Sequence, residues 1–195
     1  KSLRRPSGWL ATTVLTVMAL AMASSSRAPA ETSMLPPGAI APTERQRAIA
    51  RRVGNILEEA HYRHATIDDR MSSQVYDRYL KFLDGQHSYF LASDIAEFEQ
   101  YRLRFDDMIR TGEIEPAYVI FARFQQRNRE RMRYAIEQLK SEPDWTLNET
   151  FEFDREKSAW PASEAAIDDL WRKRVKSDAL SLILTGKSWK DAAEV

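Results

Sequence analysis

Residues 116–140, PAYVIFARFQQRNRERMRYAIEQLK, decide the fold class of this chain. Proline opens the stretch, where its missing N–H costs nothing because the first turn of a helix leaves that group unpaired. The apolar residues that follow recur at spacings of three and four, which is the period of one helix face. They are Phe121, Phe124, Met132, Ala135 and Leu139. The stretch therefore predicts a long amphipathic helix.

Two further helices are predicted before this stretch. Thr43 and Gln46 have the spacing of a capping box, which indicates a helix that begins there and runs to about His61. A second periodic pattern indicates a helix from about Asp68 to Leu83. The expected inward faces are Ile49, Val53, Ile56, Leu57 and Ala60 in the first helix, and Met71, Val75, Tyr79, Phe82 and Leu83 in the second.

Two more helices are predicted from residue 93 onward. Ser93 is the expected cap of a helix that ends at Thr111, and another helix starts near Ser163 and reaches Leu184. Ser188 has the character of one more cap. The expected inward residues are Ile95, Phe98, Phe105, Met108 and Ile109 in the first of these, and Ile167, Leu170, Trp171, Val175, Ala179 and Leu182 in the second.

Glycines punctuate these patterns. Gly85, Gly112 and Gly186 each follow an apolar period, so we expect them at helix C-termini with positive φ. Gly54 lies inside the first helix, where the absence of a side chain allows another helix to approach closely.

Two non-helical segments are predicted to carry apolar side chains. Between the fourth and fifth helices the period changes to two, which indicates an extended strap over the helices with its apolar side chains buried in grooves. These side chains are Trp145, Leu147, Phe151 and Phe153. The turn from Asp84 to Ser93 is unusually aromatic, and we expect Tyr89, Phe90 and Leu91 to insert into the core. The predicted fold is all-α, with about five amphipathic helices and one strap.

The N-terminal residues have the pattern of an export signal. A basic start at Lys1, Arg4 and Arg5 precedes the uncharged run 9–23 and a small-residue cleavage site at Ala30. We expect a signal peptide over 1–30, with a retained anchor as the alternative, then a flexible arm over 31–42 and a helical domain over 43–195. The expected location is the periplasm, with no stable membrane insertion after cleavage.

Composition narrows the classes of function. The chain has no cysteine, which excludes disulfides, thiol nucleophiles and thiolate metal sites within it. Once the four basic residues of the leader are removed, 25 basic and 29 acidic residues remain, a net charge of −4. That balance favours a soluble domain and disfavours nucleic acid as a partner.

The sequence contains one candidate metal site and one candidate basic surface. Glu58 and His61 lie at i and i+3, with His64 a turn later and His87 distant, but no second Glu-x-x-His pair exists. We interpret them as a polar helix end and expect no metal and no cofactor. Five arginines lie along the long helix, and we interpret them as a solvated or salt-bridged face. They are Arg123, Arg127, Arg129, Arg131 and Arg133.

Catalytic signatures are absent from the sequence. There is no Ser-x-x-Lys, no Gly-x-Ser-x-Gly, no His-Glu-x-x-His and no glycine-rich phosphate loop. We therefore predict no catalytic residue in this chain, and its substrate-binding residues stay unknown.

Several segments resemble, in order, the N-terminal region of the bacterial tail-specific, or carboxy-terminal-processing, proteases. They are Asp77–Asp84, Ser88–Asp94, Phe153–Pro161, Leu170–Trp171, Arg174–Asp178 and Leu184–Lys187. The resemblance implies a periplasmic serine endopeptidase in which a PDZ-like domain captures apolar C-terminal tails of protein substrates and a Ser–Lys pair hydrolyses the peptide bond. Both domains would follow Val195, and an adaptor protein is a further implied partner.

Both ends of the sequence read as cuts, because it starts with Lys1 and stops within the turn after Ser188. The expectation is thus the helical, non-catalytic N-terminal part of such a protease. The alternative is a non-enzymatic periplasmic helical binding or scaffold module, which the reading frame beyond Val195 would distinguish.

Overall fold

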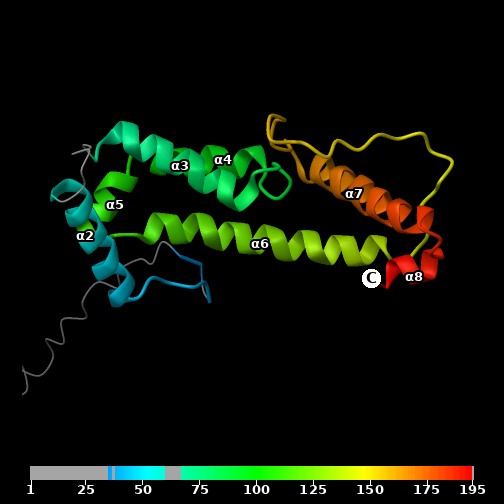
Figure 1. Ribbon diagram of the computed structural model, residues 1–195, viewed down its shortest axis with the longest axis horizontal. Coiled ribbons are helices and arrows are strands. Elements are labelled where there is room, and N and C mark those ends of the chain that lie inside the picture. The colour runs from blue at the N-terminus through cyan, green and yellow to red at the C-terminus, as the bar shows by residue number, and fades with distance from the viewer. Residues whose placement is uncertain (1–34, 37, 60–66, 195) are drawn as a thin grey trace, which may run out of the picture. The chain divides into compact units, whose positions relative to one another are not determined.

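The computed structural model describes residues 35–36, 38–59 and 67–194. The expected leader, and the histidines at 61 and 64, lie outside the described residues. In the described part the chain forms seven α-helices and one 3-10 turn without a strand, which confirms the all-α class (Figure 1). No helix among these residues is both long and apolar enough to cross a membrane.

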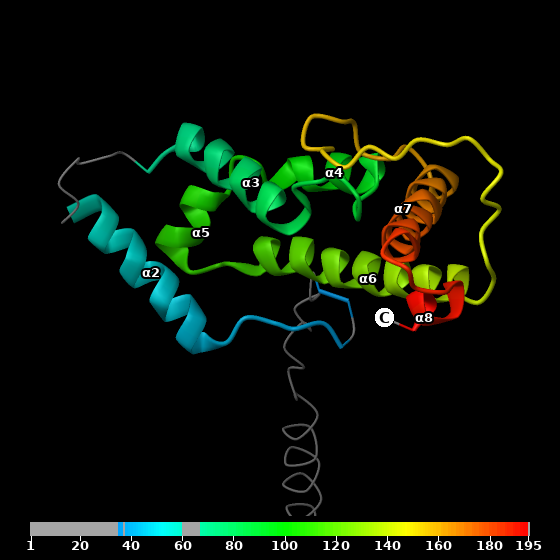
Figure 2. The ribbon, with the colours of Figure 1, turned by 45° about the vertical axis from the view of Figure 1, so that its right-hand side comes forward.

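The helices follow one another through mostly short connections. Their bounds are α2 Glu44–Glu59, α3 Asp69–Asp84, α4 Ala92–Phe98, η1 Glu99–Tyr101, α5 Phe105–Thr111, α6 Glu115–Gln138, α7 Glu164–Leu184 and α8 Trp189–Ala193. The exception is the segment between α6 and α7, which is extended and returns the chain to the start of α7 (yellow in Figures 1 and 2). We call residues 141–162 the strap.

The main core lies where α3, α4, α5 and α6 meet. Its buried side chains are Tyr76, Leu80, Leu83, Phe90, Phe98, Tyr101, Phe105, Met108 and Ile120. A second cluster of Leu91, Ile167 and Trp171 joins the aromatic turn to α7. Five of the nine buried side chains of the main core are aromatic, and the rings of Phe90 and Phe98 meet edge to face with centroids 5.3 Å apart.

The helix expected over 93–111 is divided into α4, η1 and α5. The sequence period is compatible with one helix, but the N–H of Asp106 donates to Ser72 Oγ of α3 at 2.7 Å. In a continuous helix that N–H would bond to the carbonyl of residue 102. A tertiary hydrogen bond therefore replaces a helical one at the break. The N-cap of α4 is Leu91 and not Ser93.

The same contact sets the face that α3 buries. Ser72, Tyr76, Leu80 and Leu83 point inward, whereas the side chain of Phe82 is 84% exposed, so its expected burial is wrong. Gly85 is the C-cap of α3, as predicted, but its predicted positive φ is wrong, because its φ is −64°. The positive φ of this turn belongs to His87, at 47°.

Helix α2 differs from expectation in its orientation. The capping box is confirmed, since Thr43 N–H donates to Gln46 Oε1 at 2.8 Å and Gln46 N–H to Thr43 Oγ1 at 3.3 Å. Of its predicted inward face, Ile49, Val53 and Ile56 are nevertheless exposed and Leu57 is half-buried, while Ala60 lies outside the described residues. The residue that α2 buries is Gly54. Gly54 does allow close approach, because a Cβ there would lie 2.8 Å from Cγ2 of Ile109 on α5.

The C-terminal helices follow the predicted boundaries. Pro116 lies in the first turn of α6, and the Ser163 hydroxyl accepts the N–H of Ala166 at the start of α7. Gly112 and Gly186 end helices with φ of 80° and 96°. Met132 is exposed, contrary to its predicted inward position, because α6 turns Arg131 toward α7 instead.

The strap is extended as predicted, but its apolar residues are less buried than expected. Trp145 and Phe151 are half-buried, whereas Leu147 is 53% and Phe153 70% exposed. The strap is held by the polar contacts of Glu149 and by the ring contacts of Trp160, as described below.

Candidate functional site

The aromatic turn is organised by one buried carboxylate. Asp84, 2% exposed, accepts the backbone N–H groups of Ser88, Tyr89 and Phe90 at 2.8–3.1 Å. These bonds fold the chain so that Phe90 and Leu91 are buried, as predicted, while Tyr89 is half-buried. Asp84 thereby satisfies N–H groups that the turn would otherwise leave unpaired.

The strap and α7 close over this turn. The indole Nε1 of Trp160 donates to Asp84 Oδ2 at 3.2 Å, and the Trp160 ring stacks on His87 with centroids 3.6 Å apart. The indole N–H of Trp171 donates to the carbonyl of Ser88 at 2.6 Å. Trp160 and Trp171, which are remote in the sequence, therefore both contact this turn of ten residues.

A second buried carboxylate, Asp94, joins α4 to α6. Its side chain is 1% exposed. The carboxylate accepts hydrogen bonds from Arg127 Nε at 2.8 Å, from the N–H of Leu91 at 3.0 Å and from the guanidinium of Arg123. Burial acts to raise the pKa of Asp94, but these hydrogen bonds outweigh it and hold the pKa below its usual range. Asp94 therefore stays ionised inside the protein.

The network continues from α6 to α7. Arg127 Nη1 contacts Glu164 at 2.6 Å, and Arg131, itself 6% exposed, pairs with Asp168. The interpretation of a salt-bridged face is confirmed for Arg123, Arg127 and Arg131. These arginines connect three helices of the domain.

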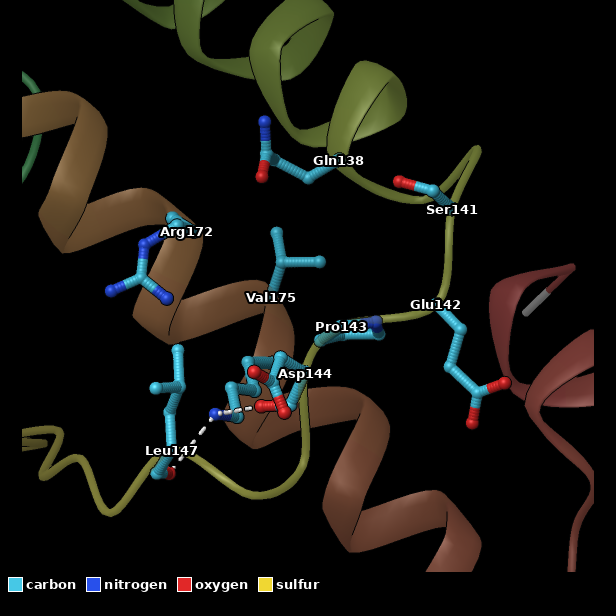
Figure 3. A pocket seen from close by; sticks show the side chains of 9 residues that line it. Gln138, Ser141, Glu142, Pro143, Asp144, Leu147, Arg172 and Val175 are labelled. Atoms are coloured by element: carbon cyan, nitrogen blue, oxygen red, sulfur yellow. Dashed lines mark hydrogen bonds between the residues drawn. The ribbon is translucent and has the colours of Figure 1, made fainter.

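The strap is anchored to α7 through Glu149 (Figure 3 shows the adjoining cavity). Arg172 Nη1 and Lys176 Nζ contact its carboxylate at 3.0 and 2.9 Å, and Lys176 also donates to the carbonyl of Asp144 at 2.6 Å. Hydrogen bonds from Arg172 and then Lys176 lower the pKa of Glu149 to about 2. The cavity beside this anchor, of about 240 Å³, lies between the end of α6, the strap and α7.

The candidate metal ligands have other partners where they are described. Glu58 pairs with Arg110 Nε at 2.9 Å, and His87 is stacked on Trp160. His61 and His64 fall in the undescribed segment. Within the described ranges, no group of three potential ligands comes together.

Two serine hydroxyls, those of Ser72 and Ser158, likewise have structural partners. Ser72 Oγ donates to Asp106 Oδ1 at 2.6 Å, and Ser158 Oγ to Glu152 at 2.9 Å. Sequence reasoning had not singled out the side chains of Asp84, Asp94 and Glu149. Their signal is a carboxylate adjoining an aromatic or apolar run, as in DGQHSYFLASD and in NETFEF.

Fold and contacts together define an all-helical domain whose elements are joined by buried carboxylates and arginines. The family described as "Tail specific protease N-terminal domain" matches residues 53–195, and the chain belongs to this family. A tail-specific protease of Haemophilus influenzae is 37% identical over 150 residues, which make up 76% of this chain. The match spans only 22% of that relative's length. The family resemblance seen in the sequence is confirmed.

Proposed function

We propose that this chain is the N-terminal, helical and non-catalytic part of a periplasmic serine endopeptidase that degrades or processes proteins from their C-terminal tails. The family match over residues 53–195 is the observation that carries the proposal. The engagement of Asp84, Asp94 and Glu149 in contacts between elements supports a structural role for this part.

The chemistry would belong to the polypeptide that follows Val195. There a PDZ-like domain would capture an apolar tail, and a lysine kept neutral by burial would take the proton from a serine that attacks the peptide bond. Such a reaction needs no metal or organic cofactor. The present domain would support the protease body, shape access to it, or receive an adaptor protein.

The test uses the full-length protein and two matched peptides with the same apolar C-terminal tail, one ending in a free carboxylate and one in an amide. We expect cleavage of the free-acid peptide, and labelling of a serine beyond Val195 by a serine-directed covalent inhibitor. Mass spectrometry of the digested protein locates the label.

Two results would contradict the proposal. A label on a serine between residues 35 and 194 would place the nucleophile in this domain. The absence of cleavage and of any label would instead favour the alternative, a periplasmic binding or scaffold module.

A further inference from the structure

Helix α2 exposes an apolar stripe. Ile49, Val53 and Ile56 are 52%, 43% and 53% exposed. Their spacings of four and three place them on one helix face. Among the described residues nothing covers this face, although an amphipathic helix normally turns its apolar stripe toward a core.

The helix cannot bury the stripe by rotating, because its opposite side is already engaged. Gly54 lies against Ile109, and Arg51 Nη1 donates to the carbonyl of Thr111 at 3.3 Å. Glu58 pairs with Arg110, and Arg47 with Glu115. These contacts fix α2 to α5 and to the start of α6. The exposed stripe lies on the other side of the helix.

The edge of the stripe is basic. Arg45 and Arg52 are exposed on the same side of α2, next to Ile49 and Val53, and neither forms an ion pair within the described ranges. A surface that covers the stripe would therefore be apolar, with carboxylates where it meets these two arginines.

The size of the stripe indicates whether a separate molecule or a segment of the same polypeptide covers it. A stable interface between separate molecules buries roughly 800 Å² per partner, which three half-exposed aliphatic side chains cannot supply. A segment of the same polypeptide needs less area, because its attachment gives it a high effective concentration. The relative from H. influenzae shows how much polypeptide could be attached, since the match spans 22% of it.

We infer that the stripe of α2 docks on the polypeptide that follows Val195, on an apolar surface edged by carboxylates. The inference rests on the proposed function, because it requires a downstream domain. In this arrangement α2 connects the helical domain to the protease body, with Gly54 and Glu58 holding one domain and Ile49, Val53 and Ile56 the other.

Photo-crosslinking of the purified full-length protein tests the contact. Benzoylphenylalanine replaces Val53 in one variant and Asn55 in a control, since Asn55 is exposed on the same helix but lies off the stripe. We expect the Val53 variant to crosslink within one molecule, to a peptide beyond Val195, and the Asn55 variant to do so far less. A crosslinked dimer, or equal yields from both positions, would overturn the inference.

Charge substitution gives an independent measurement. Val53→Asp should speed hydrogen exchange of residues 44–59 in the full-length protein by at least about tenfold, whereas Asn55→Asp should not. Equal exchange in the two variants would also overturn the inference. Neither readout depends on cleavage, so a protein that docks α2 without cleaving peptides would refute the proposed function and leave the contact standing.

Discussion

Asp84 and Asp94 are the most deeply buried carboxylates among the described residues, 2% and 1% exposed. Each ties segments that are remote in the sequence, Asp84 by accepting backbone and indole N–H groups and Asp94 by pairing with two arginines. An ionised group in such a position is stabilising only while its partners are present, because its own desolvation is costly.

Asp94→Asn tests this dependence. The change leaves Arg123 and Arg127 without their shared carboxylate, and we expect it to cost about 3–5 kcal/mol of unfolding free energy. The matched control is Glu97→Gln, whose carboxylate is 47% exposed and contacts Arg123 at 2.9 Å. Exposed pairs contribute about 0–1 kcal/mol, so urea unfolding should separate the two variants clearly. Equal losses of unfolding free energy in the two variants would show that the buried pairs of Asp94 contribute no more to stability than an exposed pair.

Gly112 and Gly186 form a second matched pair at the residue scale. Both have positive φ, which disfavours alanine by about 1–2 kcal/mol. A Cβ on Gly112 would also lie 2.6 Å from Arg51 Nη1 and 2.9 Å from the carbonyl of Arg47, whereas a Cβ on Gly186 would meet nothing within 4 Å. Thermal unfolding should therefore show a larger loss for Gly112→Ala than for Gly186→Ala. The reverse order would contradict the close packing of α2 on the end of α5.

At the scale of elements, the strap differs from the helices because buried apolar side chains contribute little to holding it. Its apolar side chains are partly exposed. The strap is held by its residue Glu149, which pairs with side chains of α7, and by its residue Trp160, which lies over the aromatic turn. Because Phe153 is 70% exposed, and not buried as the sequence predicted, Phe153→Ala should leave thermal unfolding nearly unchanged.

Acid should release the strap. The pKa of Glu149 is about 2 in the fold against an ordinary value of 4.5, so its ionised form stabilises the fold above about pH 4.5. This contribution is lost as the pH falls from about 4.5 toward about 2. Pepsin digestion in that range should cut the strap increasingly as the pH falls. Glu149→Gln should already be cut at the upper end, and a wild-type strap cut equally at both ends would argue against this anchor.

At the scale of the whole molecule, the domain presents a fixed helical body with one uncovered stripe on α2. The core joins α3 to α6, the arginine network extends it to α7, and the strap closes the aromatic turn. An exported precursor would have to fold this body without disulfides, which the absence of cysteine in the sequence requires.

Export itself is tested on the intact precursor. The basic, apolar and small-residue order of residues 1–30 leads us to expect cleavage near Ala30 during transfer to the periplasm. Mass spectrometry of the periplasmic protein should give an N-terminus close to Glu31. A product that keeps residues 1–30 in the cytoplasm would contradict both the leader and the proposed location.

The sequence alone was sufficient for most of the helix boundaries and for the family. Helix period, the Thr43 box, the Ser163 and Ser188 caps and the glycines at 112 and 186 depend on neighbours within a few residues, so local chemistry determines them. The family resemblance was likewise carried by short ordered segments.

The tertiary structure alone decided which faces are buried and where the long third pattern breaks. Ser72 selects the inward face of α3 and interrupts the helix before Asp106, and Gly54 turns α2 so that its apolar side faces outward. Asp94 gains its arginines from a helix that begins some twenty residues later. Such choices depend on contacts between remote segments, and a periodic pattern records only that a helix has an apolar face, not what covers it.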